Sequence, residues 1–122
     1  MLAKDMMGVG MPAEFAIREG FPGTSAVTAA GSSTTDATVL VKEQRVVIMT
    51  ATGADGIRLP STAELMVPYI VVNTSGSTGK VYPPTSGTLN GAAADAAISV
   101  ATLKAITCMR YSSTGWVANL SA

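Results

Sequence analysis

From residue 38 onward, the sequence consists of short runs of Val, Ile and Thr that are separated by Gly, Pro, Asn and Ser. No run is long enough for an ordinary helix, and turn residues at this spacing are typical of an all-β domain. We predict an all-β fold, a small jelly-roll-like or tulip-like β-sandwich or barrel. The expected strands are 38–41, 45–51, 57–59, 68–73, 80–82, 97–100, 105–111 and 116–119.

The turns between these runs carry their own signals. Asp55-Gly56 is a hairpin signal leading into the strand at 57–59, and Asn90-Gly91 is a second turn pair. Pro60 ends one strand, and the tandem prolines at 83–84 stop another. The Ala-rich stretch 91–97 is too short for a helix, so we expect a turn or the approach to a strand.

Residues 1–37 differ in character from residues 38–122, and we expect an N-terminal arm followed by a β domain. Within the arm, residues 12–19 predict one short helix, with Pro12 in its first turn and Gly20 just past its end. Residues 24–36 are small and polar and predict a linker or an extended arm. A mobile tail is the alternative for the whole arm, although its Met and Phe side chains favour docking on a surface. The docking residues we expect are Met6, Met7, Met11, Phe15, Ile17 and Phe21.

The composition limits both the core and the partners. Nineteen Ala and twelve Val stand against two Phe, three Tyr and one Trp, so a lone domain would have a thin core that partner surfaces complete. Eight basic and eight acidic residues cancel, which argues against nucleic acid or an acidic membrane as a partner. The first five residues lack an apolar signal segment, and no run approaches a membrane span, so we expect synthesis in a cytoplasm.

The residue types for catalysis and metal binding are scarce. The chain has no His and one Cys, and its acidic residues are scattered through different turns, so we expect no enzyme, no metal and no cofactor. Glycines at 8 and 10 and the pair Gly79-Lys80 imitate phosphate loops in spelling only. Cys108 is expected to be an inert core thiol; the alternative is a reactive thiol activated by Arg110.

Several segments in chain order resemble tailed-bacteriophage virion structural proteins. They are Gly10–Ala16, Gly56–Pro60, Tyr69–Asn73, Val81–Pro84, Gly87–Gly91 and Gly115-Trp116. Among these proteins the chain is most similar to a small capsid decoration protein, also called a cement or head-stabilising protein.

That resemblance implies a homotrimer on the outer surface of the virion capsid, clamping neighbouring subunits of the major capsid protein. It also implies that the apolar strands supply the trimer contacts and the core. The residues expected for these oligomer and core strands are Val46, Val47, Ile48, Ile70, Val72, Ile106 and Met109.

Two other hypotheses for the function remain open. A head-fibre or tail-fibre component would use its β domain to bind a host glycan, and Tyr82 and Trp116 would be its surface-recognition aromatics; core packing is the alternative role for these rings. A small enzyme or anti-host factor is the second reading, which the absence of His disfavours.

Overall fold

The computed structural model describes residues 24–53 and 55–121. These residues form ten strands and no helix, which confirms the all-β prediction. The expected helix at 12–19 and all six docking residues lie outside the described part. The strands are β1 (Thr24–Thr28), β2 (Thr38–Val39), β3 (Val46–Thr50), β4 (Gly56–Arg58), β5 (Pro68–Asn73), β6 (Gly79–Tyr82), β7 (Thr88–Leu89), β8 (Ile98–Val100), β9 (Lys104–Arg110) and β10 (Gly115–Leu120).

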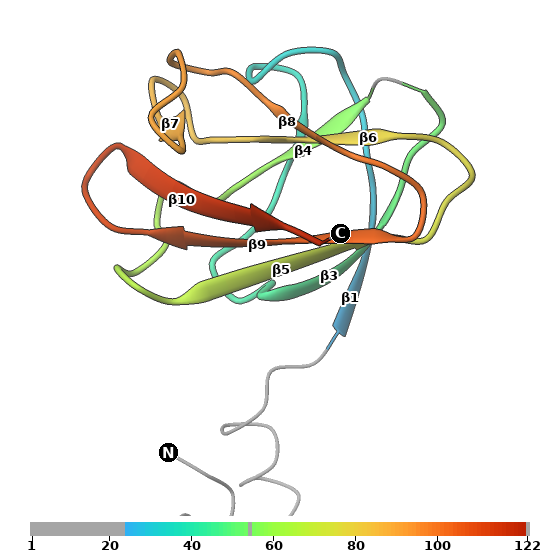
Figure 1. Cartoon of the computed structure of the whole chain (residues 1–122), viewed down its shortest axis with the longest axis horizontal. Helices are drawn as coiled ribbons and strands as arrows, with labels where there is room; N and C mark the ends of the chain where they lie inside the picture. The colour runs from blue at the N-terminus through green and yellow to red at the C-terminus, as the bar shows by residue number, and fades with distance from the viewer. Residues whose placement is uncertain (1–23, 54, 122) are drawn as a thin grey trace, which may run out of the picture.

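Two sheets make up the fold, a six-stranded sheet in the order β1-β3-β5-β9-β10-β7 and a four-stranded sheet in the order β2-β4-β6-β8. From β1 to β6 the chain alternates between the two sheets, and each new strand pairs parallel to the strand two positions earlier. The first half of the domain therefore winds like a short β-solenoid of three coils (Figure 1). An all-antiparallel jelly roll would pair these strands differently.

Each coil passes from the six-stranded to the four-stranded sheet through a corner that a short polar side chain closes. The Asp36 carboxylate accepts hydrogen bonds from the backbone N–H groups of Ser32 and Ser33. The Asp55 carboxylate does the same for Thr52 and Gly53. Side chains of this kind replace the backbone partners that a turn lacks, which explains their position between strands.

The Asp55-Gly56 pair does not form the turn that its sequence predicts. We predicted a hairpin there, but β3 and β4 lie in different sheets and do not pair. Gly56 is needed for close approach instead, because a Cβ at this position would lie 2.7 Å from the carbonyl oxygen of Lys80 on the neighbouring strand β6.

The second half of the domain closes the coils with antiparallel strands. β8 pairs with β6, β9 pairs with β5, and β10 pairs with β9. The Asn90-Gly91 turn is confirmed, with φ angles of 54° and 72° at its two residues. The Asn90 side chain then pairs with Ala118 on β10 through two hydrogen bonds of 2.9 and 2.8 Å.

β1 was expected to be part of a linker, and that expectation is wrong for Thr24–Thr28. The strand lies at the edge of the six-stranded sheet, paired parallel with β3 over five residues. Its small polar residues favour a strand only weakly, and only Val27 reaches the core, at 8% exposure. Pairing with an apolar neighbour, rather than its own composition, fixes this strand.

The core lies between the two sheets and centres on two aromatic rings. Trp116 and Tyr69 pack edge to face with ring centroids 5.9 Å apart and an interplanar angle of 66°. Aliphatic side chains from both sheets surround them, and the largest of these are Leu40, Met49, Ile57, Leu59, Leu89 and Ile106.

Candidate interaction surface

The outward side of the six-stranded sheet is the most unusual surface of the described residues. Alternation along each strand sends one set of side chains into the core and the other set outward. In β3, Val47 and Met49 are buried, whereas Val46, Ile48 and Thr50 point away from the core. We call the outward set the outer face; it consists of Thr24, Ala26, Thr28, Val46, Ile48, Thr50, Pro68, Ile70, Val72, Ala105, Thr107, Met109, Val117 and Asn119.

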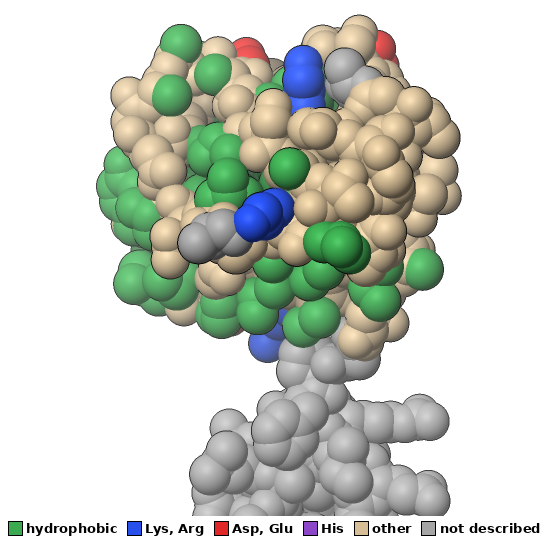
Figure 2. Space-filling view, turned by 45° about the vertical axis from the view of Figure 1, so that its right-hand side comes forward, with side chains coloured by type: hydrophobic (Ala, Val, Ile, Leu, Met, Phe, Trp, Pro, Cys, Tyr) green, Lys and Arg blue, Asp and Glu red, His purple; other side chains and the backbone are tan. Residues whose placement is uncertain are grey.

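Strand register brings the apolar members of the outer face together. One cross-strand row joins Ile48 to Val72, and the next joins Val46 to Ile70. No side chain of the outer face is charged. The four-stranded sheet differs, because its outward side carries Arg58 and Lys80. In Figure 2, hydrophobic side chains gather over the lower half of the view, at the height of the six-stranded sheet in Figure 1, and charged side chains are few.

The side chains of the outer face are accessible. Ile48 and Val117 are 37% and 42% exposed, and Ile70, Val72 and Met109 are half-buried by their neighbours. A hollow of about 300 Å³ lies beside Met109 and Val117 and is lined also by Thr107, Ala118 and Asn119. The outer face is therefore an apolar, slightly hollowed sheet that a protein surface can cover.

A loop with two exposed apolar side chains adjoins this surface at the start of β5. Residues 61–67 lead into Pro68 of the outer face and hold Leu65 and Met66 at 58% and 60% exposure. The backbone of Met66 has a φ of 62°, a region in which bulky side chains are rarely found. Such strain persists only where surrounding contacts fix the backbone.

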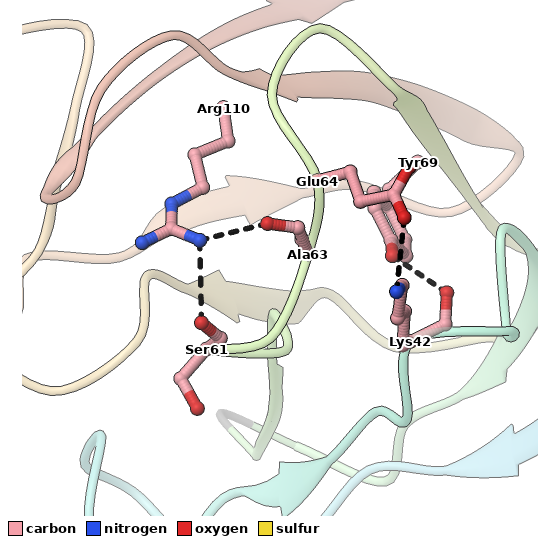
Figure 3. A network of polar contacts seen from close by, with 6 residues as sticks. All are labelled: Lys42, Ser61, Ala63, Glu64, Tyr69 and Arg110. Carbon is pink, nitrogen blue, oxygen red and sulfur yellow. Dashed lines mark hydrogen bonds and ion pairs between the residues drawn. The ribbon is translucent and has the colours of Figure 1, made fainter.

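Polar contacts around the loop provide this constraint (Figure 3). The Arg110 guanidinium donates to the carbonyl oxygens of Ser61 and Ala63 at 3.3 and 2.7 Å. The Lys42 ammonium pairs with the Glu64 carboxylate at 3.0 Å, and this hydrogen bond and charge lower the pKa of Glu64. The Met66 N–H donates to the carbonyl of Arg110 at 2.8 Å. The loop is thus fastened from two sides while its apolar side chains face solvent.

The residues predicted for the oligomer and core strands divide into two groups. Val47 and Ile106 lie in the core at 1% and 0% exposure. The other five belong to the outer face, which the sequence alone did not separate from the core; they are Val46, Ile48, Ile70, Val72 and Met109. The exposed loop was missed, and its signal was the apolar pair Leu65-Met66 directly before a Pro-started strand.

The predicted surface-recognition role of Tyr82 and Trp116 is wrong. Trp116 has no exposed surface and fills the centre of the core. Tyr82 is 5% exposed and packs its ring over Gly56, whose missing side chain leaves the room. Neither ring is open to a sugar, so the core-packing alternative holds for both.

Cys108 and Arg110 do not form a reactive pair. The thiol has no exposed surface, and desolvation raises its pKa to about 12. The guanidinium is engaged by backbone carbonyls, including those of Ser112 and Ser113 at 3.0 and 2.8 Å. Within residues 24–53 and 55–121, no group of three or more His, Cys, Asp or Glu is placed to hold a metal ion. The same residues contain no helix of the length and hydropathy that a membrane span requires.

Comparison with known proteins identifies no relative, since no family, no curated protein and no solved structure matches this chain.

Proposed function

We propose that this chain is a non-catalytic structural protein of a bacteriophage particle, which decorates and stabilises the capsid. In this proposal the protein is a homotrimer on the capsid surface that clamps neighbouring subunits of the major capsid protein. We expected a jelly-roll-like or tulip-like domain for such a protein. The proposal uses only the part of that expectation that concerns two packed β layers.

The observation that carries the proposal is the outer face. The largest contiguous apolar patch on a soluble protein is often functional, and contact with another protein is one of its common uses. A decoration protein has to bury surface against other protein subunits, and it needs no catalytic group to do so. The described residues offer such a surface on a well-packed scaffold.

The use of charged side chains supports the same conclusion. Asp36 and Asp55 close corners of the coils, and Arg110 fastens the loop at 61–67. Arg58 donates to the carbonyl oxygen of Thr34 at 2.9 Å across a corner of the fold. These side chains stabilise the scaffold, and charge recognition of nucleic acid would need a basic patch that the sequence does not provide.

The first experiment measures the copy number of this chain in purified particles relative to the major capsid protein. We expect about one copy per capsid subunit. A few copies per particle would replace decoration with the fibre alternative, and absence from particles would refute a virion role.

A binding experiment then tests the mechanism. Expanded capsid shells that lack the protein are mixed with the full chain or with a chain that lacks residues 1–22. We expect the full chain to decorate the shells and the shortened chain to remain a folded oligomer that does not bind. Decoration by the shortened chain would show that the arm is not the capsid-docking element.

A further inference from the structure

We infer that the outer face of the six-stranded sheet, together with the loop that carries Leu65 and Met66, is the surface on which a second copy of this chain docks. The inference rests on the proposed function in taking the chain to be an assembling protein, and it assigns the self-contact to one side of the fold, so that in the proposed trimer the outer faces of the copies meet around the threefold axis. The surface in contact with the capsid is then a different one.

The chemistry of the outer face favours a second copy of this chain over other classes of partner. The face carries no charge, so two copies meet without like-charge repulsion and bury no unpaired ion. Its polar members are Thr hydroxyls and one Asn amide, groups that both donate and accept hydrogen bonds. Such groups can pair with the same groups of a second copy.

Other partners find less on this surface. Nucleic acid needs Lys or Arg against its phosphates, and the outer face has neither. Host glycans are commonly held by exposed aromatic rings, whereas Trp116 and Tyr82 are buried in this fold. The remaining class of partner is a protein with a matching apolar surface. A second copy of this chain has such a surface.

The size of the surface fits a modest protein interface. Five strands of about five residues span about 24 Å by 17 Å, or about 400 Å² of flat sheet. A stable interface buries roughly 800 Å² of accessible surface on each partner. The sheet supplies about half of this amount, and Leu65 and Met66 add apolar surface at the start of β5, where both are more than half exposed.

The rigid loop contributes more than area. Arg110 and the Lys42–Glu64 ion pair hold its backbone, so the two apolar side chains lose little conformational freedom when a partner covers them. Met66 remains at a φ of 62° in the free chain, which indicates that the exposed arrangement is built into the fold.

The test is sedimentation equilibrium of the full chain over a range of protein concentrations. Ile48→Glu places a charge on β3 within the outer face, at a position that is already 37% exposed. Val39→Glu is the matched control, because Val39 is a β-branched strand residue with 47% exposure on the other sheet. We expect the wild type and Val39→Glu to self-associate equally and Ile48→Glu to dissociate about a hundredfold more readily.

Mixing supplies a stricter test of the self-contact. If outer faces pack against each other, Ile48→Glu mixed with Ile48→Lys should associate more strongly than either variant alone. Circular dichroism monitors folding, and Val117→Glu tests the same face if Ile48→Glu does not fold. A wild-type chain that is monomeric at all concentrations, or Ile48→Glu and Val117→Glu variants that associate like the wild type, would overturn the inference.

The outcomes separate this inference from the proposed function. A monomer that decorates capsid shells would refute the self-contact and leave decoration standing. An oligomer that depends on Ile48 but never binds shells would support the self-contact and refute decoration.

Discussion

Replacing Asn73 by Ala should destabilise this fold more than any other change of a single polar side chain in its core. Asn73 has no exposed surface, and its amide N–H₂ group donates to the carbonyl oxygens of Ser77 and Val100, both at 2.8 Å. Its amide oxygen accepts from the backbone N–H and the hydroxyl of Ser75 at 3.0 and 2.5 Å. The side chain thus ties the β5–β6 corner to the end of β8.

The size of the destabilisation depends on which hydrogen-bond partners of Asn73 can form new hydrogen bonds in the Asn73→Ala variant. The Ser75 hydroxyl can turn to the Ser77 carbonyl, which lies 3.2 Å away, so that end of the network is partly restored. The Val100 carbonyl belongs to a residue with no exposed surface, and its hydrogen bond with the Asn73 amide is lost where water does not reach. One buried loss of about 1–3 kcal/mol and the smaller net loss of the other bonds give about 3 kcal/mol for Asn73→Ala.

Urea and thermal unfolding at one fixed protein concentration measure this loss, since any self-association makes stability concentration-dependent. A loss of about 3 kcal/mol corresponds to a fall in Tm of about 15 °C for a domain of this size. Thr74→Ala is the control, because it removes a polar group from the exposed neighbouring position outside the outer face, and we expect a change within about 0.5 kcal/mol. Equal effects of the two substitutions would refute the role given to the buried amide.

Three further predictions concern the packing, the thiol and the corners. Gly56→Ala should lower the free energy of unfolding by about 1–3 kcal/mol in urea titrations, because its Cβ would lie 2.7 Å from the Lys80 carbonyl oxygen. Gly76→Ala has nothing within 4 Å of its Cβ and should be neutral; a similar loss at both glycines would contradict the packing argument. The Cys108 thiol, with its pKa raised to about 12, should resist iodoacetamide at pH 8 until urea unfolds the chain, and rapid native labelling would disprove its burial. Hydrogen bonds from neighbouring serines lower the pKa of Asp36, so its contribution to stability is present above the unfolded pKa of about 3.9 and is lost as pH falls through the folded pKa. Asp36→Asn should therefore unfold at lower urea than wild type at pH 6, and this difference should shrink as the pH is lowered further below the unfolded pKa of about 3.9. A difference independent of pH would exclude this explanation.

The sequence predicted the strands far better than their partners. Alternation and turn residues located eight of the ten strands, because both are local properties of the chain. The pairing is not local. Nothing in Asp55-Gly56 itself distinguishes a hairpin from a crossover between sheets, and the parallel partner of β3 is decided by packing across the whole domain.

The aromatic residues failed as surface markers for a similar reason. Trp116 follows a Gly-terminated turn, where an exposed ring and a buried ring have the same local sequence. Its burial depends on Tyr69, 47 positions earlier in the chain, against which its ring packs. A core this poor in large side chains needs its one Trp inside, and that argument from composition would have favoured burial.

The apolar runs of β3 and β5 bear on whether the outer face is covered. A strand with one wet face normally alternates apolar and polar residues, and a strand covered on both faces has a near-continuous apolar run. The runs at 46–49 and 69–72 are continuous, yet the residues that the structure describes cover only one side of them. Val47 and Val71 pack in the core, whereas Ile48 and Ile70 face outward. The pattern is that of strands covered on both faces, and a second layer against the outer face, as a second copy would provide, accounts for residues that the isolated fold does not need.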